Sequence, residues 1–585
     1  MSTLLFKKVD YNLGKLLEDI AIGEIGLPDI QRPFVWDKAH VRDLFDSMYR
    51  GYPIGTLLFW ENGYPGDHRT IGVDRKQKVP NLLIVDGQQR LTALYAVMKG
   101  IPIIDKHFQQ RRLRIAFNPL KEKFEVTNTA IERDPAWIAD ISVLWQPDFD
   151  QYAFVYAFLE RLNERRGLTE EERKRIPQAI QRLVNLINYP LTALEISVSA
   201  TEEQVSEIFV RINSQGRALN QADFILTLMS VFWDEGRKEL EDFCRHAKHP
   251  PTNNCSSPYN PYFQPQPEQL LRVDVAVAFR RARLEHVYSI LRGKDLQTGE
   301  FSPERRDEQF DKLREAQNKV LNPQNWRDFL KVIKRAGYIH PSLITSETAL
   351  VYTYALWLIG KWDFGLHPHT LRNLMARWFF MSSLTGRYTS SPETRMDQDL
   401  ALLRSRSRPE EFVQVLEQEM AAVLTSGYWK VTLPNDLAKA SAHNPGQAAF
   451  FASLCLLDAP VLYSSMKVRD LLDPTSREQK SALERHHLFP RKFLHRQGIT
   501  DTREINQVAN FALVEWRDNI DISDRPPAEY APEYESLFDP DSLKEMYEYH
   551  ALPEGWYQMK YEDFLKERRC RMAEIIRRGF ESLRK

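Results

Sequence analysis

Two adjacent histidines, His486 and His487, stand shortly before Pro490 in the last quarter of the 585-residue chain. A neutral imidazole can take a proton from water near neutral pH, and a second imidazole can bind a divalent metal ion. Asn510 and Asn519 follow, and an amide oxygen is a suitable ligand for a hard cation. These residue types permit metal-dependent hydrolysis of a phosphodiester. The alternative interpretation is a surface histidine pair before a turn.

The order and spacing of these residues resemble the ββα-metal fold of HNH nucleases. Residues 486–490, HHLFP, match the first strand of that family, which is followed by an Asn that opens an apolar strand and by a metal-binding His or Asn nine residues later. The resemblance implies that His487 is the general base, that His486 and Asn519 bind Mg²⁺ or Mn²⁺, and that Asn510 fixes the loop carrying the base.

The zinc-binding cysteine pairs that some HNH nucleases carry are missing. The four cysteines are scattered and form no C-x-x-C pair: Cys244, Cys255, Cys455 and Cys570. This argues against a structural zinc site and against a disulfide framework. Packing against the rest of the chain must therefore replace the zinc.

A second motif, residues 86–90 (DGQQR), stands between an apolar run and a helical pattern. Such a junction directs backbone N–H groups and the positive end of the helix to one spot. Gly87 allows a sharp turn, Asp86 could hold a metal ion, and Arg90 could clamp a phosphate. The alternative is an Asp-Gly turn that only caps a helix.

Two further stretches, residues 30–37 (IQRPFVWD) and 209–223 (FVRINSQGRALNQAD), accompany the DGQQR motif. In order and spacing, the three resemble the N-terminal domain of GmrSD-type modification-dependent restriction enzymes, a ParB-like, sulfiredoxin-related fold. The resemblance continues weakly through residues 387–393 and then joins the HNH segment. It implies a nucleotide-binding or DNA-sensing site formed by Asp86, Gly87, Gln88, Gln89, Arg90, Gln31, Arg32, Arg211 and Asn213.

Plain structural roles are open for several of these residues: Trp36 in the core, Arg32 in a surface ion pair, and Asn213 with Gly216 at a helix end. No G-x-x-x-x-G-K-[ST] sequence occurs, so any NTPase activity must use another phosphate cradle.

Hydrophobic periodicity predicts an α+β multidomain protein. We expect a ParB/sulfiredoxin-like α/β domain over residues 1–245, a helical middle domain over 268–425 and a ββα-metal (HNH) nuclease domain over 430–585. Residues 249–267, rich in Pro, Asn and Ser, form a linker or long loop.

Several individual elements are also predicted. Asp37 should cap a helix that buries Val41, Leu44, Phe45 and Met48, and Asn220 should cap another. Residues 55–60 and 81–85 have strand patterns, and residues 113–117 and 123–126 form a hairpin. The chain should end in a helix with one apolar face: Leu565, Met572, Ile576, Phe580 and Leu583.

The formal net charge of −1 excludes a uniformly basic nucleic-acid binder but not a local basic face. Basic runs occur at residues 111–114 and 568–571, where a solvated face is the plain interpretation. No signal-peptide core and no apolar run of about 20 residues is present, so we expect a cytoplasmic protein that has no membrane partner.

The favoured hypothesis is a modification-dependent DNA endonuclease of anti-phage defence. The N-terminal domain would bind and hydrolyse an NTP (GTP, ATP or another), and the HNH domain would cut modified double-stranded phage DNA. One alternative keeps this architecture as a phosphorothioate-DNA-stimulated NTPase and nickase. Another is a non-catalytic, nucleotide-gated DNA-binding regulator. The oligomeric state, including a homo-oligomer, stays open.

Overall fold

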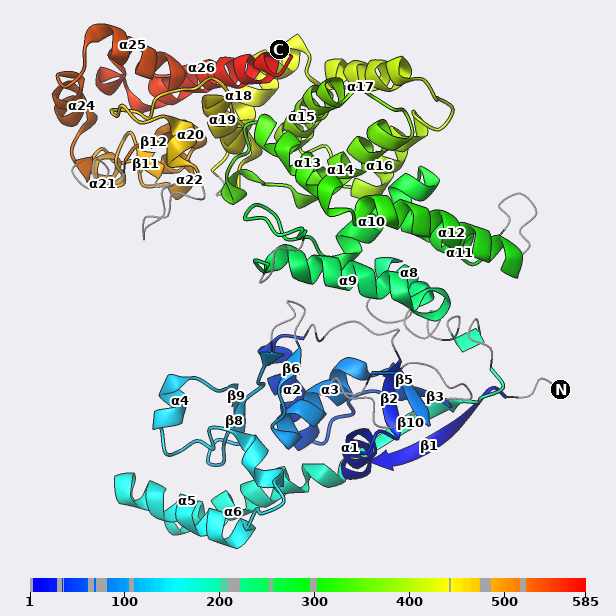
Figure 1. Ribbon diagram of the computed structural model, residues 1–585. Helices are drawn as coiled ribbons and strands as arrows, with labels where there is room; N and C mark the ends of the chain where they lie inside the picture. Colours follow the sequence, from blue (N-terminus) through cyan, green and yellow to red (C-terminus); the bar gives the residue numbers. More distant parts are fainter. Residues whose placement is uncertain are drawn as a thin grey trace. The chain divides into compact units, whose positions relative to one another are not determined.

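The computed structural model describes residues 4–28, 34, 36–61, 68–69, 81–104, 110–200, 204–205, 208, 221–251, 256–294, 302–440, 443–473, 485–515 and 522–584. The chain divides into two compact units, Met1–Arg237 and Lys238–Lys585, with the division inside helix α9 (Asp234–Lys248). The first unit contains a mixed sheet and the second is mostly helical (Figure 1), so the expected α+β class is confirmed.

A six-stranded mixed sheet runs through the first unit in the order β1-β10-β3-β5-β2-β4. Its strands are β1 (Phe6–Asn12), β2 (Ile25–Pro28), β3 (Leu57–Glu61), β4 (His68–Arg69), β5 (Leu82–Asp86) and β10 (Pro190–Ile196). β10 lies parallel to β3, and β5 lies parallel to β2, whereas the other neighbouring pairs are antiparallel. Two of the predicted strands, over 55–60 and 81–85, correspond to β3 and β5.

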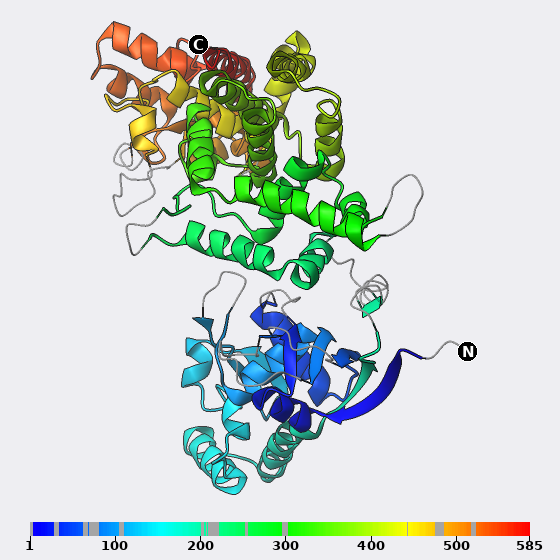
Figure 2. The same cartoon turned by 45° about the vertical axis from the view of Figure 1, so that its right-hand side comes forward.

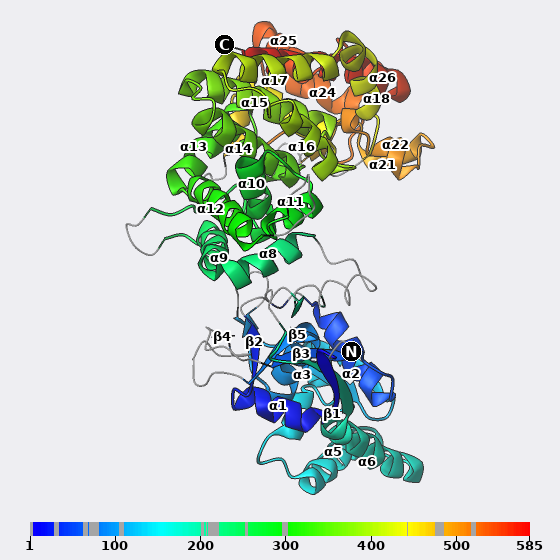
Figure 3. The ribbon, with the colours of Figure 1, turned by 90° about the vertical axis from the view of Figure 1, so that its right-hand side faces the viewer.

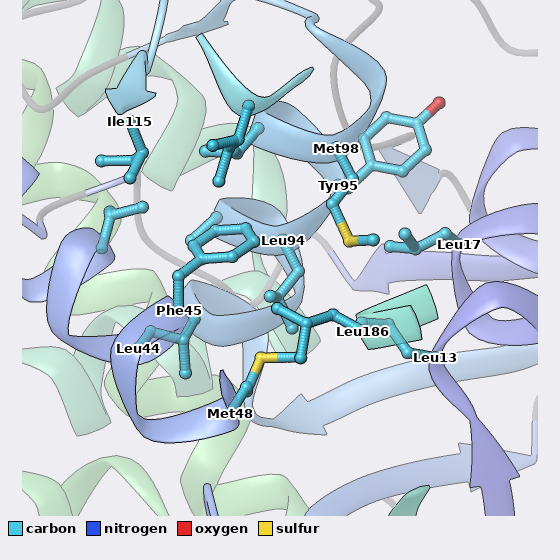
Figure 4. Close-up of a cluster of buried hydrophobic side chains, with 14 of the residues drawn as sticks. Leu13, Leu17, Leu44, Phe45, Met48, Leu94, Tyr95, Met98, Ile115 and Leu186 are labelled. Atoms are coloured by element: carbon cyan, nitrogen blue, oxygen red, sulfur yellow. The ribbon is translucent and has the colours of Figure 1, made fainter. Parts of the chain in front are cut away.

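Three helices pack with this sheet: α1 (Leu13–Ala21), α2 (Lys38–Tyr49) and α3 (Gln88–Lys99). Asp37 caps α2 by accepting a hydrogen bond from the His40 N–H, and the predicted apolar stripe of α2 is buried, so this expectation is confirmed. Figure 4 shows side chains of the three helices meeting in one cluster, with Phe45, Leu94 and Leu17 among them. The core of the unit therefore forms around α3, which is buried on nearly every side.

Smaller elements complete the first unit. The predicted hairpin is present as β8 (Ile115–Asn118) and β9 (Lys123–Val126), and a second short pair joins β6 (Ile103–Ile104) to β7 (Gln110–Arg111). The remaining helices are α4 (Thr129–Arg133), α5 (Gln151–Arg166), α6 (Glu170–Val184) and α8 (Gln221–Phe232). α5 and α6 lie side by side as a helical hairpin in Figures 1 and 3. The expected cap at Asn220 lies outside the described residues.

The described residues between 268 and 425 are mostly helical, as predicted (Figure 2). The helices are α10 (Pro267–Phe279), α11 (Leu284–Leu291), α12 (Pro303–Val320), α13 (Pro323–Arg335), α14 (Glu347–Trp362), α15 (Pro368–Thr385), α16 (Pro392–Ala401) and α17 (Pro409–Val423). Many begin with proline, whose fixed φ suits the first helical position and whose missing N–H is not needed there. Arg387, in the weakly resembling stretch, is buried in ion pairs with Asp399 and Glu419.

The Pro-rich stretch before α10 is a loop within the second unit, between α9 and α10. Asn260 accepts hydrogen bonds from the N–H groups of Tyr262 and Phe263 and donates one to the Phe263 carbonyl. Trp326 donates its indole N–H to the Pro258 carbonyl. These contacts fix the described part of the loop to the helices beside it.

The C-terminal part of the second unit combines short elements with one long helix. They are a π-helix (Tyr428–Thr432), α18 (Leu433–Asp436), α19 (Pro445–Leu456), α20 (Val468–Leu471), β11 (Arg485–His487), α21 (Arg491–Arg496), α22 (Thr502–Ile505), β12 (Phe511–Leu513), α24 (Pro527–Glu535), α25 (Pro540–Tyr549) and α26 (Tyr561–Ser582). α26 buries its predicted apolar face against α15, α18 and α19. Among the described residues, no helix is long and apolar enough to span a bilayer.

Candidate active site

The histidine pair lies on β11, which pairs antiparallel with β12 (Figure 1). His486 stands opposite Ala512, and His487 stands opposite Phe511. Successive side chains of a strand point to opposite faces. The two imidazoles accordingly have different neighbours: the His486 ring lies edge-on to Tyr530 of α24, and the His487 ring packs against Phe511, with ring centroids 4.4 Å apart. Both rings could reach the same phosphate only if it lay between the two faces of the hairpin.

Asn510, directly before β12, clamps the chain that follows His487. Its side chain is fully buried, and its Oδ1 accepts a hydrogen bond from the Phe489 N–H at 2.8 Å. Its Nδ2 donates to the carbonyls of Phe489 and Ile505, and its own carbonyl accepts from the Leu488 N–H. The buried amide therefore satisfies both polar groups of Phe489 and fixes the loop next to the predicted base.

His487 is half-buried, and burial is the main cause that lowers its pKa from the ordinary value. A hydrogen bond with Asn506 opposes that shift, and the charge of Arg491 adds to it. The ring Nε2 donates to Asn506 Oδ1 at 2.9 Å, which leaves the lone pair of the neutral ring on Nδ1. An uncharged imidazole with a fixed tautomer is what a general base near neutral pH requires.

His486 is almost completely buried, with 3% of its surface exposed. Tyr530, beside it, donates its hydroxyl to the Leu488 carbonyl at 2.7 Å and so binds α24 to the segment after the histidines. The other predicted metal ligand, Asn519, lies outside the described residues. Within the described part of the chain, no group of three or more His, Cys, Asp or Glu side chains is arranged to hold a metal ion.

A donor set of one imidazole and one amide suits a weakly held hard cation. Mg²⁺ keeps several waters and is commonly held by few protein ligands together with substrate phosphate oxygens. His486 is the expected imidazole ligand of such a site, and it stands directly before the predicted base, His487. Two protein ligands are fewer than the four that enclose a structural zinc ion, so Mg²⁺ or Mn²⁺ stays the expected ion.

Arg568 of α26 is a site residue that the sequence pattern did not reveal. Its guanidinium is fully buried and donates to the carbonyls of Ala509 and Phe511, on either side of Asn510, and to the His550 carbonyl. Burial lowers its pKa to about 9, so the group is still charged at neutral pH. The side chain anchors the first residue of β12 to α26.

The interpretation of residues 568–571 as a solvated face is therefore wrong for Arg568, although Arg571 is exposed and pairs with Glu567. Arg568 lies four residues after Phe564 and four before Met572, on the apolar face of α26. That helical spacing is the signal that could have identified it as buried. His495, on α21, is exposed.

The DGQQR motif forms the turn from β5 into α3, with Gly87 as the N-cap at φ +96°. A Cβ at this position would lie 2.3 Å from Leu57 Cδ2, so the turn requires glycine for both its backbone conformation and its close packing. Gln88 and Gln89 are half-buried in the first turn of α3. Asp86 pairs with Arg90 at 3.1 Å.

The Arg90 guanidinium is directed at the preceding strand connection. Its Nη1 donates to the Ile54 carbonyl at 2.6 Å, and its Nη2 donates to the Thr56 carbonyl at 2.8 Å. Gly55 lies between these residues at φ +91°, and a Cβ there would lie 2.5 Å from Arg90 Nη1. Arg90 thus fastens the turn to β3, whereas its expected role as a phosphate clamp stays a prediction.

The other predicted sensing residues, Gln31, Arg32, Arg211 and Asn213, lie outside the described residues. Trp36 is half-buried and packs against the core of the first unit. The structure therefore brings together Asp86–Arg90 in one unit and His486, His487 and Asn510 in the other.

Comparison with known families identifies a domain in the first unit. Residues 13–230 match the family model described as the GmrSD restriction endonuclease, N-terminal domain. Residues 13–230 are therefore similar to the N-terminal domain of GmrSD restriction endonucleases. This domain match suggests a function of the restriction endonuclease type and DNA as the partner.

A relative from Methanocaldococcus jannaschii, the uncharacterized protein MJ0686, is 23% identical over 558 residues. The alignment covers 89% of this chain and 86% of the relative. The similarity therefore extends well beyond the GmrSD-type N-terminal domain.

Proposed function

We propose that this GmrSD-type chain is a modification-dependent DNA endonuclease of anti-phage defence that cuts with the β11–β12 hairpin. The observation that carries the proposal is the buried Asn510 clamp, which holds the chain immediately after a neutral, half-buried His487. The hairpin would be the core of an HNH-type nuclease domain, and the mixed sheet would be a ParB-like nucleotide-binding and DNA-sensing domain.

In this proposal His487 Nδ1 takes the proton from the attacking water. Asn506 keeps the ring in the required tautomer through the hydrogen bond to Nε2. Asn510 keeps the loop in place but does not touch the reacting atoms. A Mg²⁺ or Mn²⁺ ion held by His486 and Asn519 would stabilise the charge that develops on the phosphate.

The N-terminal domain would control this cut. The DGQQR turn leads into the N-terminus of α3, and the positive end of a helix favours an anion such as a nucleotide phosphate. Hydrolysis of an NTP there would license or end cutting. A sugar on a modified base needs a roomy polar pocket, whereas a backbone sulfur needs a small contact beside a phosphate clamp.

The test crosses a nucleotide panel with DNA carrying glucosylated hydroxymethylcytosine, phosphorothioate or no modification, in Mg²⁺ or Mn²⁺, and scores phosphate release and nicking. Loss of a general base should lower the cutting rate of His487→Ala by about 10²- to 10⁴-fold. His495→Ala, which changes an exposed histidine of α21, should cut like the wild type. Equal cutting by His487→Ala would disprove the assignment of the base.

Metal titration by calorimetry separates a nuclease from a non-catalytic DNA-binding regulator. The wild type should bind a divalent ion, and Asn519→Ala should weaken that binding. A protein that binds no divalent ion, with or without DNA, would not be the proposed nuclease.

A further inference from the structure

A hollow of 370 Å³ in the first unit is lined by three arginines from two helices. Arg133 ends α4, and Arg165 and Arg166 end α5. The floor includes the fully packed side chain of Leu162. One carboxylate, Asp134, also lines the hollow, and its Oδ1 accepts a hydrogen bond from the Ala136 N–H.

Some arginines of the first unit are neutralised by carboxylates. Arg112 and Arg114 both pair with Asp140, and Arg114 also pairs with Glu132 at 2.5 Å. Arg182, on α6, pairs with Glu122 at 2.9 Å. Other arginines of α5 and α6, such as Arg161 and Arg175, form no ion pair with a described residue, so pairing is not uniform in this part of the unit.

The hollow contains both paired and unpaired arginines. Arg166 pairs with Glu172 at 2.7 Å, but Arg133 and Arg165 form no ion pair with any residue that the structure describes. Basic residues in the last turn of a helix complement its dipole, which accounts for Arg165 and Arg166 within α5. It does not account for the convergence of arginines from two separate helices on one concave surface.

A planar guanidinium recognises phosphate oxygens in pairs, and a concave positive surface concentrates phosphates. We propose that Arg133, Arg165 and Arg166 form a phosphate-binding hollow through which the first unit holds the backbone of duplex DNA. This inference rests on the proposed function, because it assigns a contact to the DNA that the chain cuts. Backbone contacts of this kind position a protein on DNA without reading its sequence.

The same phosphate chemistry is found in a free nucleotide, so the experiment must separate the two sources. The hollow has room for a phosphate and part of the attached sugars. The polar side chains that line it are all charged. It offers no aromatic side chain on which a base would stack. These features favour the sugar-phosphate backbone over a complete nucleotide.

The test measures binding of the full chain to an unmodified duplex oligonucleotide by fluorescence anisotropy over a range of salt concentrations, without divalent metal. Each phosphate contact contributes about 0.9 to the slope of log K against log salt concentration. The double variant Arg133→Gln/Arg165→Gln should therefore lose about 1.8 from that slope. The control Lys174→Gln/Arg175→Gln removes the same charge from exposed positions of α6 and should change the slope much less.

Three results would overturn the proposal: a wild type without DNA binding, an unchanged slope in the hollow variant, or an equal loss in both variants. The last result would indicate a diffuse electrostatic field in place of a site. A nucleotide arm uses a labelled NTP with the same variants. If the hollow variant lost NTP binding and kept the DNA slope, the ligand would be a nucleotide, and the DNA assignment would be wrong.

DNA cleavage by the wild type is scored separately in metal. A chain that binds DNA through the hollow but never cuts it would refute the nuclease assignment and leave the phosphate contact standing. Thermal melting of both double variants checks that the α5–α6 hairpin is intact.

Discussion

Replacing Arg568 with methionine should loosen the candidate nuclease hairpin specifically. Three backbone carbonyls, of Ala509, Phe511 and His550, accept hydrogen bonds from this buried guanidinium. A buried acceptor left without a partner costs about 1–3 kcal/mol. Arg568 has no carboxylate partner among the described residues, so removing this buried cation also removes the cost of burying its charge and offsets part of the loss. We therefore take the lower end for each of the three carbonyls, which gives a destabilisation of about 3 kcal/mol in total.

Hydrogen–deuterium exchange, followed by mass spectrometry, measures this effect locally. Peptides covering residues 485–515 should exchange roughly 100-fold faster in Arg568→Met, because about 1.4 kcal/mol corresponds to a factor of ten. Arg571→Met, on the exposed side of the same helix, should change the protection of these peptides little. Arg568→Lys should be intermediate, since one ammonium group cannot reach carbonyls on both sides. Equal exchange in Arg568→Met and wild type would refute the anchoring role.

Three further outcomes follow from the geometry. Asn506→Asp puts a carboxylate on the His487 ring, which favours the imidazolium, so the acid limb of the pH–rate profile should move up by about one pH unit; an unmoved limb would contradict the contact. Gly87→Ala combines left-handed backbone strain with a steric clash, so it should destabilise the first unit by roughly 2–3 kcal/mol in urea unfolding. The control Gly51→Ala adds only the backbone strain, because no atom lies within 4 Å of the new Cβ, and should cost about 1 kcal/mol. Burial lowers the pKa of His550 to about 4, below its ordinary 6.5. The contribution of the neutral ring to stability is therefore complete above pH 6.5 and is lost at about 1.4 kcal/mol per pH unit as the pH falls towards 4. Unfolding of the wild type and of His550→Gln, compared at pH 7 and pH 5, measures this loss.

Local patterns allowed much of the fold to be predicted. Helix α2 was identified by its cap and its apolar stripe, and the β8–β9 hairpin by two short alternating runs. In such elements the residues that determine the structure are neighbours in sequence. The order of strands in the mixed sheet depends on contacts between distant segments, such as β1 with β10, and periodicity contains no information about it.

The same distinction applies to the candidate site. Asn510 could be identified by spacing because its partner Phe489 belongs to the same motif. Arg90 was predicted to bind phosphate from its place beside a helix N-terminus, but its closest acceptor is the Ile54 carbonyl, 36 residues earlier. Arg568 reaches the site from α26, 57 residues after Phe511. Only the tertiary structure shows that these guanidinium groups bind backbone carbonyls.

The hairpin itself is too small to be stable alone. β11 and β12 have three residues each, and an isolated two-stranded hairpin is marginally stable in water even when it is longer. Without cysteine pairs for zinc, the stabilising contacts come from helices: Tyr530 of α24 binds the Leu488 carbonyl, and Arg568 of α26 binds both sides of Asn510. Because α26 also packs against α15 and α19, the candidate catalytic loop depends on the folding of the helical region before it. A fragment beginning at residue 430 would lack α15, and we expect it to lose the hairpin before it loses helicity.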